Sequence, residues 1–308
     1  MTLQQLRYII TISEMGSLNK AAEVLYVAQP SLSSAVRELE KELGITIFYR
    51  SGKGVTLTGD GAEFLSHARQ LYQQYEQLSE KYGSGTLKKK FGISTQHYSF
   101  AVKSFVELVK QFNTAEYEFA IRETKTREVI EDVATSKSEI GILYLSDFNR
   151  KPMEKLLRNS GLEFHKLISC EPSVYLWKGH PLAKQSSISF PELADFPCLS
   201  FEQGDGGSFY LAEEILTTSE YVRTIKATDR ATMLNLMVGL GGYTLCSGII
   251  CEELNGSDYL AIPLKADADT GGKMEIGYVV KKNLVLSRLA ELYVQELKRY
   301  LEKCTTTG

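Results

Sequence analysis

The chain has 308 residues, 43% of them hydrophobic and 24% charged, so it can form two or three globular domains with ample core. Its net charge is −3, and residues 1–90 carry 11 basic and 9 acidic side chains, which excludes binding to nucleic acid through bulk positive charge alone. It has no apolar run of membrane-spanning length and no basic-then-apolar signal pattern at its start, so we expect a cytoplasmic protein that does not bind membranes.

The first elements are three predicted helices. A helix over residues 3–12 precedes two short helices at 17–25 and 30–43, which a tight turn at 26–28 joins. Ser17 can cap the second helix, and Pro30 suits the first turn of the third. Apolar residues recur at i, i+3, i+4 and i+7, so each helix has one buried face. This pattern is typical of a helix-turn-helix, whose last helix enters the major groove of DNA.

The side chains outside the apolar face of the third helix are small hydroxyls, an amide and a guanidinium. Such groups can bind base edges and phosphates. A β-wing with a glycine-rich basic tip is predicted within residues 45–57, next to this helix. The alternative is an ordinary helical hairpin with polar outer residues and incidental charges. The candidate DNA-binding residues are Ser17, Gln29, Pro30, Ser31, Ser33, Ser34, Arg37, Arg50 and Lys53.

A long helix follows, capped by Thr58 and reaching Tyr82. Its apolar residues are spaced alternately by three and four, the a/d pattern of a coiled coil over about three heptads. We expect this helix to form a dimer, and packing on its own domain is the alternative. The residues of this pattern are Gly61, Phe64, Ala68, Leu71, Tyr75, Leu78 and Tyr82.

Up to this point the chain resembles the LysR-type transcriptional regulators. The resemblance is carried by Gly16-Ser17, Ala21-Ala22, Leu25, Gln29-Pro30-Ser31, Ser33, Leu39-Glu40, Leu43-Gly44, Phe48, Arg50, Leu57-Thr58 and Gly61. It is dense to about Gly61 and sparser beyond. It implies an all-α winged helix-turn-helix domain over 1–58, a linker and dimerisation helix over 59–83, a short linker over 84–90 and an effector-binding domain over 91–308.

From Phe91 onward predicted strands and helices alternate twice, which favours parallel sheets with helices on both faces. The second set contains a helix predicted near 209–216 and a strand predicted over 221–227. The resemblance implies an α/β fold of two Rossmann-like subdomains, like a periplasmic binding protein. Subdomain I would comprise 91–162 and 268–308, and subdomain II would comprise 163–267, with crossovers near 161–166 and 264–270.

Three loops lie where a ligand would bind in such sheets, beyond the carboxyl ends of strands and at helix N-termini. They are residues 94–97, 123–126 and 201–204. The resemblance implies effector contacts at Thr95 and at Thr124 or Thr126, although hydroxyls there can also simply cap helices. The chemistry suggests a small anion such as a carboxylate. The candidate effector-binding residues are Ser94, Thr95, Gln96, Thr124, Thr126, Phe201, Glu202, Gln203, Arg230 and Thr244.

The leading hypothesis is a transcriptional regulator that binds double-stranded DNA and responds to a small-molecule co-inducer. The resemblance implies an inverted-repeat operator, a homotetramer built as a dimer of dimers, and contact with RNA polymerase when the protein activates. An alternative is a thiol-redox sensor that uses Cys198, Cys246 and Cys251. The five cysteines are odd in number and lack CxxC spacing, which argues against a disulfide framework or a zinc site.

A third hypothesis, an enzyme with an accessory DNA-binding head, has little support. The sequence has no metal-ligand cluster and no phosphate-binding loop, and none of its four histidines has a catalytic partner at motif spacing. Only His97, which lies in a candidate ligand loop, merits a test. We expect no catalytic residues, no metal and no cofactor apart from the co-inducer.

Overall fold

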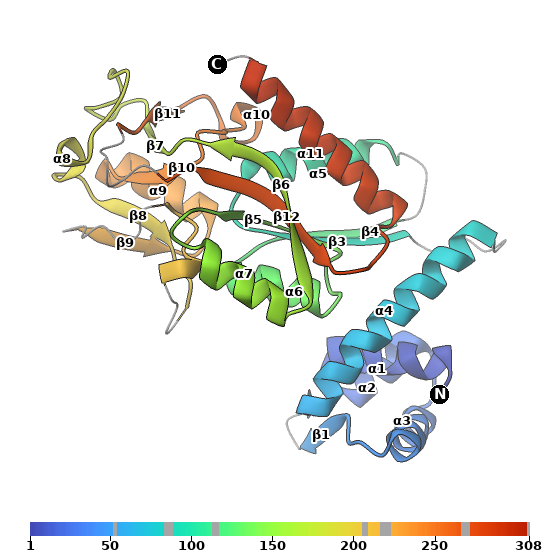
Figure 1. Ribbon diagram of the computed structural model, residues 1–308. Helices are drawn as coiled ribbons and strands as arrows, with labels where there is room; N and C mark the ends of the chain where they lie inside the picture. Colours follow the sequence, from blue (N-terminus) through green and yellow to red (C-terminus); the bar gives the residue numbers. More distant parts are fainter. Residues whose placement is uncertain are drawn as a thin grey trace. The chain divides into compact units, whose positions relative to one another are not determined.

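The computed structural model describes residues 1–51, 54–82, 89–112, 117–204, 209–215, 223–265 and 272–306 (Figure 1). The chain divides into two compact units, with the boundary between residues 88 and 89, and each unit is described by itself. Within the described ranges, no helix combines the length and the apolar character needed to cross a bilayer.

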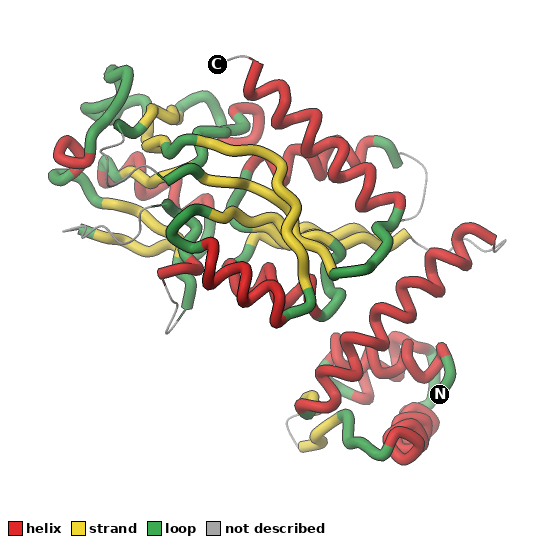
Figure 2. The backbone as a smooth tube through the Cα atoms, in the orientation of Figure 1, coloured by secondary structure: helices red, strands yellow, loops and turns green. Residues whose placement is uncertain are grey.

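The first unit is a helix-turn-helix with a two-stranded wing and a long helix (Figure 2). Its core is formed by apolar side chains from every one of its helices and from the wing, including Ile9, Leu32, Leu39 and Leu65. Ser17 caps the second helix by accepting a hydrogen bond from the Lys20 amide. The elements are α1 (Leu3–Met15), α2 (Leu18–Leu25), α3 (Gln29–Leu43), β1 (Phe48–Ser51), β2 (Gly54–Leu57) and α4 (Gly59–Tyr82).

Helix α4 has two halves with different surroundings. In the first half Leu65 and Ala68 are buried in the core, and a Cβ on Gly61 would lie 2.1 Å from the Ile47 carbonyl oxygen, so only glycine fits there. In the second half Leu71, Tyr75 and Leu78 are 46%, 40% and 63% exposed. The first half therefore packs on its own domain, and the second presents an apolar stripe. The Tyr82 side chain lies outside the described part.

The second unit contains two five-stranded sheets. The first has the order β4-β3-β5-β12-β6, in which β3 runs parallel to β4 and β5, and β12 runs antiparallel to β5 and β6. Helices α5 and α11 cover one face, and α6 and α7 cover the other (Figure 1). The elements are β3 (Lys89–Thr95), α5 (Ser99–Lys110), β4 (Tyr117–Glu123), α6 (Thr126–Ala134), β5 (Ile140–Leu145), α7 (Arg150–Asn159), β6 (Leu162–Cys170), β12 (Met274–Lys281) and α11 (Arg288–Thr306).

The second sheet has the order β11-β7-β10-β8-β9 and is also mixed. Strand β8 runs parallel to β9 and β10, and β7 runs antiparallel to β10 and β11. The elements are β7 (Ser173–Trp177), α8 (Phe190–Leu193), β8 (Cys198–Phe201), the 3-10 helix η1 (Phe209–Leu211), β9 (Thr224–Ala227), α9 (Arg230–Leu240), β10 (Tyr243–Cys246), α10 (Glu252–Asn255) and β11 (Tyr259–Pro263).

The predicted fold class is confirmed: a helical helix-turn-helix, a long helix and two α/β sheets. Three details differ from expectation. The sheets are mixed rather than parallel, because β12 runs antiparallel to β5 and β6, and β7 runs antiparallel to β10 and β11. Strand β6 lies in the first sheet, so the chain changes sheets at residues 171–172 rather than at 161–166. The return crossover expected at 264–270 lies mostly outside the described residues.

The third difference concerns residues 209–215. Instead of the predicted helix there is a single turn, η1. This segment lies within the second subdomain in sequence, between β8 and β9, but packs on the first: Leu211 is buried among side chains of α6, α7 and β5. The Tyr144 hydroxyl donates to the carbonyl oxygens of Ala212 and Glu214, each at 3.1 Å. The segment therefore holds Glu213 and Glu214 between the two sheets.

Candidate functional site

The first candidate site is the exposed face of α3. Pro30, Ser31, Ser34 and Arg37 are exposed there, and Gln29 is half-buried. No side chain caps the start of the helix at Ala28, so its first N–H groups remain available to an anion such as a phosphate. This face therefore offers small hydroxyls, one guanidinium and free amides to a nucleic acid.

Ser33 and Arg50, both predicted to contact DNA, are bonded to each other in the structure. Ser33 is only 7% exposed, and Arg50 Nη1 donates to its Oγ at 2.8 Å. The Glu40 carboxylate lies 3.9 Å from the same guanidinium and accepts hydrogen bonds from the amides of Ile47 and Phe48. Ser33, Arg50 and Glu40 thus tie the wing to α3, and Ser33 faces away from the surface that would meet DNA. Lys53 lies outside the described residues.

Two exposed aromatic side chains beside α3 were not predicted as contacts. Tyr26 is 96% exposed and occupies the left-handed C-cap position of α2, with φ of 54°. Tyr49 is exposed on β1. The tyrosine hydroxyl is a group that can contact phosphate or sugar. In the sequence, the aromatic residue Tyr26 in the turn of the helix-turn-helix was the signal that could have indicated such a contact.

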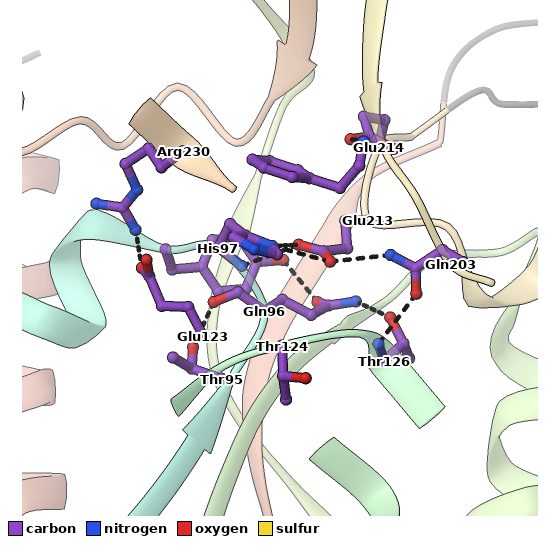
Figure 3. Close-up of polar contacts among 12 residues, drawn as sticks. Thr95, Gln96, His97, Glu123, Thr124, Thr126, Gln203, Glu213, Glu214 and Arg230 are labelled. Carbon is purple, nitrogen blue, oxygen red and sulfur yellow. Dashed lines mark hydrogen bonds and ion pairs between the residues drawn. The ribbon is translucent and has the colours of Figure 1, made fainter. Parts of the chain in front are cut away.

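The second candidate site lies in the second unit, where the three predicted loops meet. Gln96 Nε2 donates to Thr126 Oγ1 at 2.6 Å, and the Thr126 amide donates to Gln203 Oε1 at 3.0 Å. Gln203 Nε2 donates to Glu213 Oε1 at 2.9 Å. Glu213 Oε2 accepts from the His97 amide and lies 2.9 Å from His97 Nδ1. Figure 3 shows this continuous chain of contacts between the subdomains.

Two further contacts cross between the subdomains. Arg230, at the start of α9, forms an ion pair with Glu123 at the end of β4. The His97 ring stacks on Phe201, with centroids 3.8 Å apart and planes within 5°. Together with the hydrogen-bonded chain, these contacts hold the two subdomains against each other.

Several residues predicted to contact the effector form hydrogen bonds with other groups of the protein. Ser94 donates to Asp132 Oδ2 at 2.6 Å in a buried cluster, and Thr95 is buried and donates to the Gln96 carbonyl. Thr124 bonds the Glu128 side chain. These hydroxyls, with Gln96, Thr126 and Gln203, position the loops. None of them, nor Glu202, lines the cavity.

The cavity itself lies beside this network and encloses about 670 Å³, its open mouth included. Of the predicted residues, Phe201, Arg230 and Thr244 line it. The others come from both subdomains and are mostly apolar or aromatic. The lining residues are His97, Tyr98, Ser99, Tyr175, Phe201, Glu213, Glu214, Arg230, Met233, Leu234, Thr244, Leu245, Cys246, Ser247, Ile249, Ile250, Asn255 and Met274.

Two adjacent acids distinguish the cavity. Burial, and secondarily the Glu213 carboxylate, raises the pKa of Glu214 to about 8. Burial likewise raises the pKa of Tyr98 and of Tyr144, which stay protonated. Sequence gave no reason to single out these glutamates, because the segment that carries them was expected to be a helix on the second subdomain.

Two of the three cysteines of the thiol-sensor alternative, Cys198 and Cys246, lack the lowered pKa of a reactive thiol. Burial raises the pKa of both Cys198 and Cys246 to about 12, so these thiols are protonated at neutral pH. Reactive cysteines instead have a lowered pKa, because the thiolate is the nucleophile. In the described residues, no cluster of three or more His, Cys, Asp or Glu side chains is arranged to hold a metal ion.

Comparison with known proteins gives a consistent result. Residues 3–62 match the family described as bacterial regulatory helix-turn-helix protein, lysR family, and residues 97–302 match the LysR substrate binding domain. YbhD of Escherichia coli (strain K12), an uncharacterized HTH-type transcriptional regulator, is 23% identical over 94% of this chain and 89% of its own. AlsR of Bacillus subtilis (strain 168), an HTH-type transcriptional regulator, is 28% identical over 68% of each chain.

Two solved structures share the fold. A full-length OxyR variant from Pseudomonas aeruginosa has a TM-score of 0.68 at 20% identity, covering 97% of this chain and 95% of that chain. Full-length CbnR in complex with its target DNA has a TM-score of 0.55 at 16% identity, covering 97% and 100%. At these identities the likeness concerns the fold alone.

Proposed function

Because the chain belongs to the lysR family of bacterial helix-turn-helix regulators, we propose that it binds an inverted-repeat operator as a dimer and that a small molecule in the cavity alters this binding. The family match by itself supports a more general description of the protein. The protein is a DNA-binding transcriptional regulator with an effector-binding domain, and it is not an enzyme.

One observation carries the dimer: the apolar stripe of Leu71, Tyr75 and Leu78 stays exposed in the same unit that presents α3. Pairing two such stripes removes apolar surface from water and joins two copies of α3 by a two-fold axis. A two-fold protein reads a two-fold site, hence an inverted repeat. With so few basic residues in the first unit, affinity would come from several subunits, which favours a dimer of dimers.

The effector response follows from the cross-subdomain contacts. A ligand in the cavity would contact His97 and Glu213, which belong to the chain of hydrogen bonds between the subdomains, as well as residues of the second sheet. By binding one arrangement of the subdomains better than another, it shifts the population of the oligomer. In an activator, the shifted oligomer would contact RNA polymerase. All of these steps take place in the cytoplasm, with the DNA.

Selection of bound duplexes from random DNA by the purified full-length protein tests this proposal. We expect enrichment of an inverted repeat with a spaced, A·T-rich centre. The matched control is Arg37→Glu, which reverses the charge on the exposed face of α3 and should abolish enrichment. A selected sequence with a single half-site and no symmetry would contradict the dimer.

A further inference from the structure

Two side-chain oxygens of the cavity have no hydrogen-bond partner among the described residues: Glu214 Oε2 and Thr244 Oγ1. Both side chains are 6% exposed. Elsewhere in the described part of the chain only Ser136 Oγ shares this condition. A buried oxygen without a partner is destabilising, so two of them among the residues that line one cavity point to a ligand that supplies partners.

Glu214 is held in place from its other side. The Phe201 amide donates to Glu214 Oε1 at 2.7 Å, and the Tyr144 hydroxyl donates to the Glu214 carbonyl oxygen at 3.1 Å. The first bond holds the carboxyl group, the second holds the backbone that carries it, and Oε2 is left without a partner. The Glu214 side chain is therefore positioned in advance, as a recognition group must be.

The charges around the cavity are unequal. Arg230 is paired with Glu123 and also donates to Asn255 at 3.3 Å, and His97 is paired with Glu213. Each described cationic side chain that lines the cavity is paired with an acidic side chain, whereas Glu214 has no cationic partner among the described residues. An anionic ligand would find Arg230 and His97 already paired with acidic side chains, so the cavity offers the expected carboxylate no unpaired cation among its described residues.

We propose that the effector is a small organic cation, with an ammonium group paired to Glu214 Oε2, a hydrogen bond to Thr244 Oγ1, and an apolar body against Met233, Leu234 and Ile250. This inference rests on the proposed effector function of the cavity. An ammonium group beside Glu214 would favour its ionised form, and the desolvated pair would satisfy the Oε2 atom that has no partner in the described lining.

Binding of such a cation is coupled to protons. The empty site holds the Glu214 proton up to about pH 8, because burial opposes the charged form. A cation favours the carboxylate, so binding near pH 7 releases a proton and tightens as pH rises toward 8. The groups that interact electrostatically with Glu214 are Glu213, Tyr98, Tyr144 and Cys198, and the titratable or charged groups His97 and Arg230 line the same cavity.

The test uses the full-length chain and a matched panel. Phenyl, cyclohexyl, indole and branched-alkyl bodies each carry an ammonium, a hydroxyl or a carboxylate on a two-carbon linker, and affinity is measured by titration calorimetry at up to 10 mM. We expect ammonium members to bind and carboxylate members not to bind.

Glu214→Gln should weaken ammonium binding at least tenfold and remove the proton release, and Thr244→Val should weaken ammonium binding about threefold. Glu252→Gln, an exposed acid on α10, is the control and should change neither.

The proposal is overturned if carboxylate or hydroxyl members bind as tightly as ammonium members, if no ammonium member binds, or if Glu214→Gln leaves affinity and proton release unchanged. If duplex selection still returns an inverted repeat in any of these cases, the proposed regulatory function stands and only the ligand class is wrong. If selection also fails, the regulatory proposal fails independently of the panel.

Discussion

At the scale of single residues, polar side chains that look alike in the sequence have opposite roles. Ser31, Ser33 and Ser34 all lie in the first turns of α3, yet only Ser33 is buried and bonded to Arg50. A helix places successive side chains about 100° apart, so neighbours can face a core and a groove. Roles in DNA binding must therefore be assigned residue by residue.

This difference gives the first prediction. Ser33→Ala removes the acceptor of Arg50, which should cost about 1 kcal/mol and lower the Tm of the first unit by roughly 4–8 °C. Ser31→Ala and Ser34→Ala should leave Tm within about 1 °C but weaken operator binding severalfold. Thermal unfolding and fluorescence anisotropy on the selected operator measure both quantities. An unchanged Tm in Ser33→Ala, with lost affinity, would restore Ser33 as a direct DNA contact.

The second residue-scale prediction concerns Glu214 and pH. The folded protein retains the Glu214 proton to about pH 8, whereas the unfolded chain loses it near pH 4.5. The unfolded state binds fewer protons in this window, so this group makes stability fall as pH rises from 5 to 8, and the loss levels off above 8. The total is on the order of 4 kcal/mol.

Glu214→Gln removes the titration, so its Tm relative to the wild type should rise with pH, by roughly 5–10 °C between pH 5 and 8.5. Calorimetric melting of both proteins across this range measures the difference. Glu252→Gln controls for a general loss of negative charge and should follow the wild type. A Tm difference between Glu214→Gln and the wild type that does not vary with pH would contradict the assignment.

At the scale of elements, α4 serves two purposes along its length. Its first half completes the core of its own domain, and its second half exposes Leu71, Tyr75 and Leu78. The a/d spacing in the sequence continues through both halves, so sequence alone predicted one coiled coil. Only the packing of Leu65 and Ala68 on the domain core shows where intradomain packing ends.

Helix α4 yields the third prediction. Leu71→Glu with Leu78→Glu puts charge on the exposed stripe and should raise the dimer dissociation constant at least a hundredfold, because each change removes apolar burial and adds a charge to desolvate. Sedimentation velocity measures the dimer. Gln73→Glu adds a charge at a half-buried position on the face of α4 opposite the stripe and serves as the control. A double variant that remains dimeric at the wild-type concentration would place the dimer contact elsewhere.

Some of these elements could be predicted from the sequence, and others could not. Local signals were sufficient for α2, α3 and the alternation of strands and helices, since caps, apolar periodicity and turn residues act within one element. They did not reveal that β12 returns antiparallel to β5, or that residues 209–215 pack on the first sheet. Those features depend on contacts between segments far apart in the chain, and they bring Glu213 and Glu214 into the cavity.

At the scale of the whole molecule, dimerisation and DNA reading are one mechanism. If two copies of α3 are joined through α4, the second half-site is bound intramolecularly once the first is occupied, which typically gains about a hundredfold or more. The fourth prediction is that the selected inverted repeat binds at least a hundredfold tighter than a single half-site or a direct repeat of the same half-sites. Fluorescence anisotropy with three duplexes of equal length measures this difference. In the Leu71→Glu, Leu78→Glu variant the three affinities should converge, because each head then binds alone; equal affinities already in the wild type would mean that the heads are not joined by a two-fold axis.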